Sequence, residues 1–150
     1  EKLDNDSAKV TMGTGVYETV FNIGETPKPT KKGKKPVAKK LDGEWAIDLG
    51  DVRESARVYI NNEYMGCAWS VPYILNIDGK ILNEGSNTIR IEVTNLPANR
   101  IADLDRRGVE WRKFEEINVV DIKYKKNKYD GWAPMPSGLN SSVRIYQLED

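Results

Sequence analysis

Apolar and polar residues alternate one by one in several short segments of this chain, and few folds are compatible with that pattern. Trp45, Ile47 and Leu49 alternate with Ala46 and Asp48, which is typical of a half-buried β-strand. Similar segments follow at 56–60, 73–77, 88–93, 117–124 and 142–148, and residues 10–23 favour one or two further strands. The alternation predicts an all-β fold made of two packed antiparallel sheets.

Turn residues separate the expected strands, and helical periodicity is scarce. Asn61 and Asn62 stand between two strand-like segments, and asparagine tolerates the positive φ angles of a tight hairpin. Residues 98–116 are charged and aperiodic, and they are compatible with a short helix or with a long structured loop.

The composition excludes several classes of function. The chain has 150 residues, with 23 Lys and Arg against 23 Asp and Glu, so it has no general attraction for nucleic acid or for anionic membranes. It contains no histidine, which excludes a Ser-His-Asp triad and the commonest transition-metal ligand. Cys67 is the single cysteine and is interpreted as a small buried hydrophobe.

We expect residues 1–150 to form one domain, because a chain of this length can bury a core of its own. It begins at Glu1 rather than Met, which we interpret as a cut boundary, with the domain taken from the C-terminal part of a larger protein. Residues 24–41 are rich in lysine, with Pro and Gly among them, and predict a solvated, mobile loop. The alternative is a polyanion-binding arm, although no aromatic residue interleaves these lysines.

Two stretches together resemble a known kind of module. Residues 47–77 read IDLGDVRESARVYINNEYMGCAWSVPYILNI, and residues 82–100 read LNEGSNTIRIEVTNLPANR. With the Pro-Ser-Gly-Leu element at 136–139, they resemble the accessory β-sandwich of rhamnosidase-like glycoside hydrolases and of the β-galactosidase and β-glucuronidase superfamily. Asn62 and Asn140 depart from the family pattern, the first standing where glycine is usual.

The resemblance implies a jelly-roll β-sandwich of the galactose-binding-like type. In that family the catalytic carboxylates lie on a separate barrel domain, so the chain is expected to be a non-catalytic module of a glycoside hydrolase. Its partners would be carbohydrate and the catalytic domain of the parent enzyme. Its compartment would be that of the parent, periplasmic or extracellular if the parent is secreted. Such sandwiches often hold a structural calcium, to which Asp4, Asp6 or Glu149 could contribute, and no other cofactor is expected.

Aromatic residues are the candidate sugar-binding groups, because an aromatic ring packs against the apolar face of a pyranose. Trp111 and Trp132 lie in irregular polar segments and are the first candidates, whereas Trp69 follows a strand and is either core or rim. Asn99 and Arg100 come after a strand end, where they either form a polar fork for sugar hydroxyls or bind loop carbonyls.

Three functions therefore remain open: a carbohydrate-binding module, a structural sandwich that packs on a catalytic domain, and a small free-standing glycosidase. The third requires two carboxyl groups that face each other. Acidic residues are present, but none has a supporting motif; they are Asp48, Asp51, Asp103, Asp105, Glu110, Glu115 and Glu116.

Overall fold

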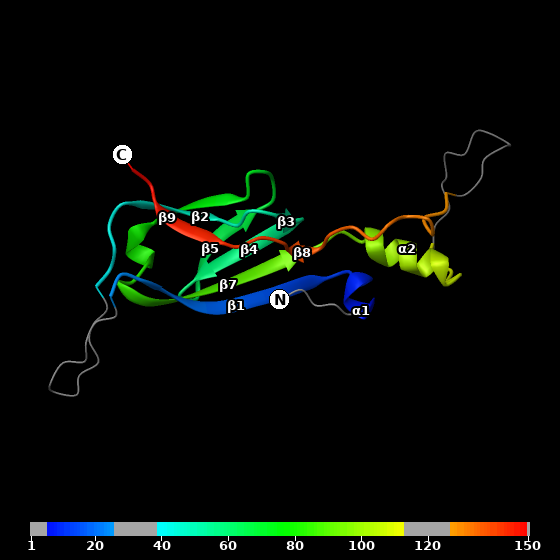
Figure 1. Cartoon of the computed structure of the whole chain (residues 1–150), viewed down its shortest axis with the longest axis horizontal. Helices are drawn as coiled ribbons and strands as arrows, with labels where there is room; N and C mark the ends of the chain where they lie inside the picture. Colours follow the sequence, from blue (N-terminus) through cyan, green and yellow to red (C-terminus); the bar gives the residue numbers. More distant parts are fainter. Residues whose placement is uncertain (1–5, 26–38, 113–126, 150) are drawn as a thin grey trace, which may run out of the picture. The chain divides into compact units, whose positions relative to one another are not determined.

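A computed structural model of the chain describes residues 6–25, 39–112 and 127–149. The chain divides into two compact units, and Figure 1 labels their helices and strands. The sandwich unit comprises Thr14–Asn95 and Ser137–Asp150, and the helical unit comprises Glu1–Gly13 and Leu96–Pro136. That the whole of 1–150 is one domain stays a prediction.

All the described strands belong to the sandwich unit and pair antiparallel. A four-stranded sheet has the order β1-β7-β4-β5, formed by β1 (Thr14–Ile23), β7 (Gly85–Thr94), β4 (Ser55–Ile60) and β5 (Glu63–Ala68). A three-stranded sheet has the order β6-β2-β9, formed by β6 (Ile74–Asp78), β2 (Glu44–Asp48) and β9 (Arg144–Gln147). A short pair joins β3 (Val52–Arg53) to β8 (Gly138–Leu139), and a 3₁₀ turn, η1 (Gly79–Ile81), follows β6.

The core lies between the two larger sheets. Ile47 on β2 and Ile77 on β6 belong to the same buried cluster as Val58 on β4 and Ile91 on β7. These are inward positions of the alternating segments, so removal of their side chains from water holds the sheets together. The predicted all-β sandwich is confirmed.

The β4–β5 connection is the hairpin that the Asn61–Asn62 pair predicts. Both residues have positive φ, 50° and 68°. Asn62 therefore adopts the conformation that the turn requires at a position where glycine is usual. The Asn61 amide also donates to Asn87 Oδ1 (2.9 Å) and accepts from the Thr88 N–H (3.0 Å).

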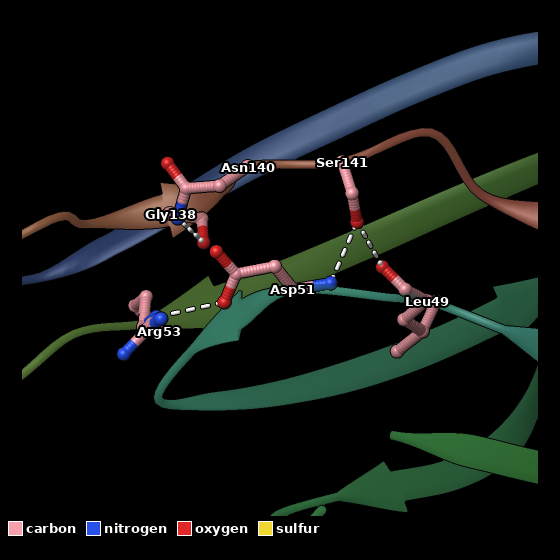
Figure 2. Close-up of polar contacts among 6 residues, drawn as sticks. All are labelled: Leu49, Asp51, Arg53, Gly138, Asn140 and Ser141. Atoms are coloured by element: carbon pink, nitrogen blue, oxygen red, sulfur yellow. Dashed lines mark hydrogen bonds and ion pairs between the residues drawn. The ribbon is translucent and has the colours of Figure 1, made fainter. Parts of the chain in front are cut away.

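A set of polar contacts fastens residues 138–141 to 49–53, as Figure 2 shows. Ser141 Oγ accepts from the Asp51 N–H (2.6 Å) and donates to the Leu49 carbonyl (3.1 Å). The Asn140 N–H donates to the Asp51 carbonyl (2.9 Å). Asn140 therefore fits this closing segment, although it departs from the family pattern.

The helical unit contains α1 (Asp6–Lys9) and α2 (Ala98–Arg106). Helix α2 decides between the two alternatives for 98–116, because the first half of that stretch is helical and residues 107–112 are irregular. The strand expected at 117–124 and most of the expected lysine-rich loop (26–38) lie outside the described residues. No helix in the described ranges is long and apolar enough to cross a membrane.

Candidate functional site

Three aromatic side chains gather in the helical unit after α2. Tyr129 contacts Trp111 (ring centroids 6.3 Å apart, planes tilted by 42°) and Trp132 (4.7 Å, 58°). The aromatic cluster, as we call Trp111, Tyr129 and Trp132, thus unites the two irregular stretches that the sequence singled out. Tilted ring pairs at these distances are favourable contacts.

Asp105, near the end of α2, holds the cluster together. Its Oδ1 accepts from Trp111 Nε1 (2.6 Å), and its Oδ2 accepts from the backbone N–H of Tyr129 (2.7 Å). The Trp111 bond, followed by the Tyr129 bond and the charges of Arg112 and Lys128, lowers the pKa of Asp105 below its ordinary value. One carboxylate therefore links the helix to both aromatic segments.

Arg112 covers part of the cluster. Its guanidinium carbon lies 4.9 Å from the Trp111 ring centroid and 5.3 Å from that of Tyr129, which is cation–π geometry. The same guanidinium donates to the Asn127 carbonyl. Trp111 is accordingly engaged twice, through its ring and through its N–H.

A hollow of about 300 Å³ lies beside Trp111. Its walls carry acidic, basic and amide groups as well as the indole; they are Asp105, Gly108, Val109, Glu110, Trp111, Arg112, Asn127, Lys128 and Asp130. Polar groups around an aromatic ring are what a saccharide with many hydroxyls requires.

Exposure separates the two predicted tryptophans of this cluster. The Trp132 side chain is 48% exposed, whereas Trp111 is half-buried between Asp105 and Arg112. The ring available to a ligand is therefore that of Trp132, and Trp111 forms part of its support.

Asn99 and Arg100 are both on α2, and both are engaged within the protein. The buried Asn99 amide donates to the Met135 carbonyl and accepts from the Met135 N–H, each at 2.8 Å. Asn99 thus binds a loop, which is one of the two roles expected for it. Its two hydrogen bonds to Met135 hold residues 132–136 against α2. Arg100 forms an ion pair with Asp103 (3.4 Å), which also pairs with Arg107 (2.9 Å).

Trp69 belongs to the sandwich unit, in the connection between β5 and β6. It is 75% exposed, and Val71 in the same loop is 82% exposed. Of the two alternatives for Trp69, the rim position is the one observed. In contrast, Trp45 packs against the core and donates its N–H to the Asp42 carbonyl (3.1 Å).

The candidate carboxylates are mostly engaged in pairs with hydrogen-bond donors. Asp51 binds Arg53 (2.7 Å), and Asp48 binds Arg144 (2.6 Å) as well as the Gly50 N–H (2.9 Å). The Gly50 bond, with Arg144 acting in the same direction, lowers the pKa of Asp48, and the Asp51 carboxylate raises that of Arg53. Glu115 and Glu116 lie outside the described residues.

Within the described ranges, no three His, Cys, Asp or Glu side chains are close enough to hold a metal ion. Asp4, one of the three residues suggested for calcium, lies outside those ranges. Another hollow, of about 420 Å³, is present in the sandwich unit; its walls are Asp42, Gly43, Glu44, Asn76, Ile77, Asp78 and Lys80.

Sequence reasoning missed Tyr129 and the role of Asp105. Tyr129 stands between Lys128 and Asp130 with no periodic pattern around it, and its ring contact with Trp111 joins residues 18 positions apart. The available signal was its closeness in sequence to Trp132.

Comparison with known proteins finds the chain similar to parts of glycoside hydrolases. It is 27% identical to "Putative beta-glucuronidase" of Formosa agariphila, in a match that covers 97% of this chain and 13% of that protein. A solved rhamnosidase structure from Novosphingobium sp. PP1Y is 26% identical and superposes with a TM-score of 0.65, over 96% of this chain and 12% of that one. No family model matches the chain.

The chain thus spans only about an eighth of the relatives it matches, and it corresponds to one small domain of these large glycoside hydrolases. The resemblance found in the sequence is confirmed.

Proposed function

We propose that this chain is a non-catalytic accessory module of a glycoside hydrolase that binds carbohydrate through the aromatic cluster. The observation that carries the proposal is the half-exposed Trp132 ring, which contacts Tyr129. Tyr129 in turn contacts Trp111, and Trp111 lines a hollow that carries acidic, basic and amide groups. The relatives named above, a rhamnosidase and a putative β-glucuronidase by their names, make saccharides the natural ligands to test.

In this proposal the Trp132 ring packs against the apolar face of one sugar unit. A neighbouring unit enters the hollow, where Glu110, Asp130 and Lys128 bind its hydroxyls. Asn99 and Asp105 position the two segments through their hydrogen bonds to Met135 and Trp111. A single small site of this kind binds weakly, because stacking is offset by desolvation of the sugar hydroxyls.

The direct test is calorimetric titration of the chain with rhamnose- and glucuronate-containing oligosaccharides, including plant-cell-wall fragments. We expect millimolar affinity, with Trp132→Ala weakening it about fivefold or more, as the loss of one stacking contact would. Tyr146→Ala, which removes a 41%-exposed ring from β9, is the matched control and leaves affinity unchanged.

Two results would redirect the assignment. Binding that survives Trp132→Ala and is lost in Trp69→Ala places the site on the β5–β6 loop of the sandwich unit. If no oligosaccharide binds at millimolar concentrations, the carbohydrate-binding proposal is wrong.

A second candidate function, a structural sandwich that packs on the catalytic domain, is favoured by one observation. The sandwich unit exposes several large apolar side chains, with Val16 at 60%, Val20 at 61% and Val71 at 82%. A neighbouring domain would cover them. Loss of stability on changing all three to threonine in the full parent enzyme, but not in this chain alone, would support this function.

The non-catalytic part of the proposal rests on the carboxylates. Asp48, Asp51, Asp103 and Asp105 are each held by donors of this chain, whereas glycoside hydrolysis needs two carboxyl groups on opposite sides of a bond. We expect no turnover of aryl rhamnosides or glucuronides. Turnover that is lost in Glu110→Gln would show the chain to be a glycosidase.

A further inference from the structure

The outer face of the four-stranded sheet carries a second aromatic group, separate from the aromatic cluster. On β4, Ala56, Val58 and Ile60 are buried, so the residues between them, Arg57 and Tyr59, point to the opposite face. This face lies away from the core.

Tyr59 is the centre of a row that runs across the sheet. It lies opposite Tyr64 on β5 and opposite Arg90 on β7. The two tyrosine ring centroids are 5.3 Å apart, and the Arg90 guanidinium carbon is 3.8 Å from the Tyr59 centroid. Arg90 thus covers Tyr59, while Tyr64 at the outer end of the row stays 56% exposed.

The charges on this face are not all paired. Arg90 forms an ion pair with Glu92. Arg57 is opposite Glu92 in the strand register and is exposed, yet no described residue forms a hydrogen bond or ion pair with its guanidinium. Arg57, without a partner in the described ranges, is therefore two residues from Tyr59, about 7 Å along the strand.

We propose that this face binds a sugar that carries a carboxylate, a uronic acid unit within an oligosaccharide. The pyranose packs on the open Tyr64 ring, and the Arg57 guanidinium forms a bidentate pair with the carboxylate. The Arg90–Glu92 pair supplies polar groups to the hydroxyls. This site is independent of the one in the helical unit, so either can fail without the other.

The composition of the face favours a saccharide over a protein partner. Glu18, Arg57, Arg90 and Glu92 come from three adjacent strands, and charged residues are depleted in the centres of protein interfaces. Tyr64 on β5 is exposed, and Arg57 on the neighbouring β4 has no partner among the described residues. Together they offer one flat apolar surface and one anion-binding group.

The test is an NMR titration of the ¹⁵N-labelled 150-residue chain with α-1,4-linked trigalacturonate, in the Trp132→Ala background to remove the other proposed site. We expect shifts of the β4 and β5 amides with a dissociation constant of about 1 mM, as for a small single site. Arg57→Gln should weaken binding about tenfold, and Tyr64→Ala about fivefold. Arg144→Gln, the control, removes the same charge from the other sheet. It should change the dissociation constant by less than about twofold.

The methyl-esterified trisaccharide keeps the rings and lacks the charges, so it should bind about tenfold more weakly than trigalacturonate. Equal binding of the two sugars, or unchanged binding in both Arg57→Gln and Tyr64→Ala, would overturn the proposal. So would the absence of any β4 or β5 shift at 10-fold the expected dissociation constant. Arg57 and Tyr64 are at the surface, and thermal unfolding of each variant checks that the fold is intact.

Discussion

Asn87 is the residue on which the turns of the sandwich unit depend most. It is 1% exposed, and its side-chain amide forms four hydrogen bonds: it accepts from Asn61 Nδ2 and the Asn83 N–H, and it donates to the carbonyls of Asn83 and Gly85. An amide has two donors and two acceptor positions, so its capacity is fully used. In the sequence, Asn87 is only one residue of the stretch 82–100 that resembles the accessory sandwich. Its hydrogen-bond partners could not be predicted, because the fold sets them.

Replacement of Asn87 by alanine should lower the free energy of unfolding by about 2–4 kcal/mol, because several buried backbone groups lose their partners. Urea denaturation measures this. Asn76→Ala, at an exposed β6 position, is the control and should stay within about 0.5 kcal/mol of the unaltered chain. Equal effects of the two substitutions would refute the role given to Asn87.

Carboxylates with lowered pKa values should make the stability fall in acid. Both Asp48 and Asp105 have pKa values below the ordinary 3.8. Their contribution to the free energy of unfolding is therefore fully present above pH 3.8. It is lost as the pH falls through the lower pKa of the folded state. We expect stability that changes little from pH 7 to 5 on their account and declines below about pH 4. The Asp48→Asn variant should show a shallower decline of the free energy of unfolding in acid, measured by urea denaturation at each pH. A pH profile identical to that of the unaltered chain would contradict the role given to Asp48.

Among the elements, the strands were more predictable from sequence than the helices. The alternating segments at 45–49 and 88–93 correspond to β2 (Glu44–Asp48) and β7 (Gly85–Thr94), because each strand buries one face and so must alternate. Helix α1 was not predicted, since its four residues are too few to show a period. The end of α2 at Arg106 was also not predicted, and it matters because it places Asp105 beside the aromatic cluster.

Helix α2 positions the aromatic segment through Asn99, and this can be tested by hydrogen exchange. In Asn99→Ala the Met135 amide loses its acceptor, so its exchange should become at least about tenfold faster, since local opening then costs less free energy. The amides of β4 and β7 should exchange as before. Faster exchange throughout both units would mean instead that the substitution lowers global stability.

For the molecule as a whole, the sequence predicted the sandwich and the resemblance to domains of glycoside hydrolases, but not the division into two units. The division depends on contacts such as that of Asn99 with Met135, which joins residues 36 positions apart. No local pattern encodes such a contact. The candidate site was predictable in part: Trp111 and Trp132 were identified as the first candidates, whereas Tyr129, which contacts both, was not.

Among the described residues, Asn87 and Asn99 lie in different units and have no hydrogen-bond partner in common. The effects of replacing each of them on the free energy of unfolding should therefore add. The double variant Asn87→Ala/Asn99→Ala should lose the sum of the two single losses within about 0.5 kcal/mol. A double-mutant cycle by urea denaturation measures the difference. A larger coupling energy would show that the units stabilise each other.

The position of β2 between β6 and β9 has a consequence for synthesis on the ribosome. Strand β9 pairs with β2 along 45–48, and residues 138–141 fasten to 49–53 just before it (Figure 2). The second sheet therefore stays one strand short until residue 147 has left the exit tunnel, whereas Asn99 and Met135 both leave it earlier and can pair before then. A nascent polypeptide would acquire the aromatic cluster first and close its sandwich last, so a translational pause before residue 144 would expose the edge of β2 to chaperones.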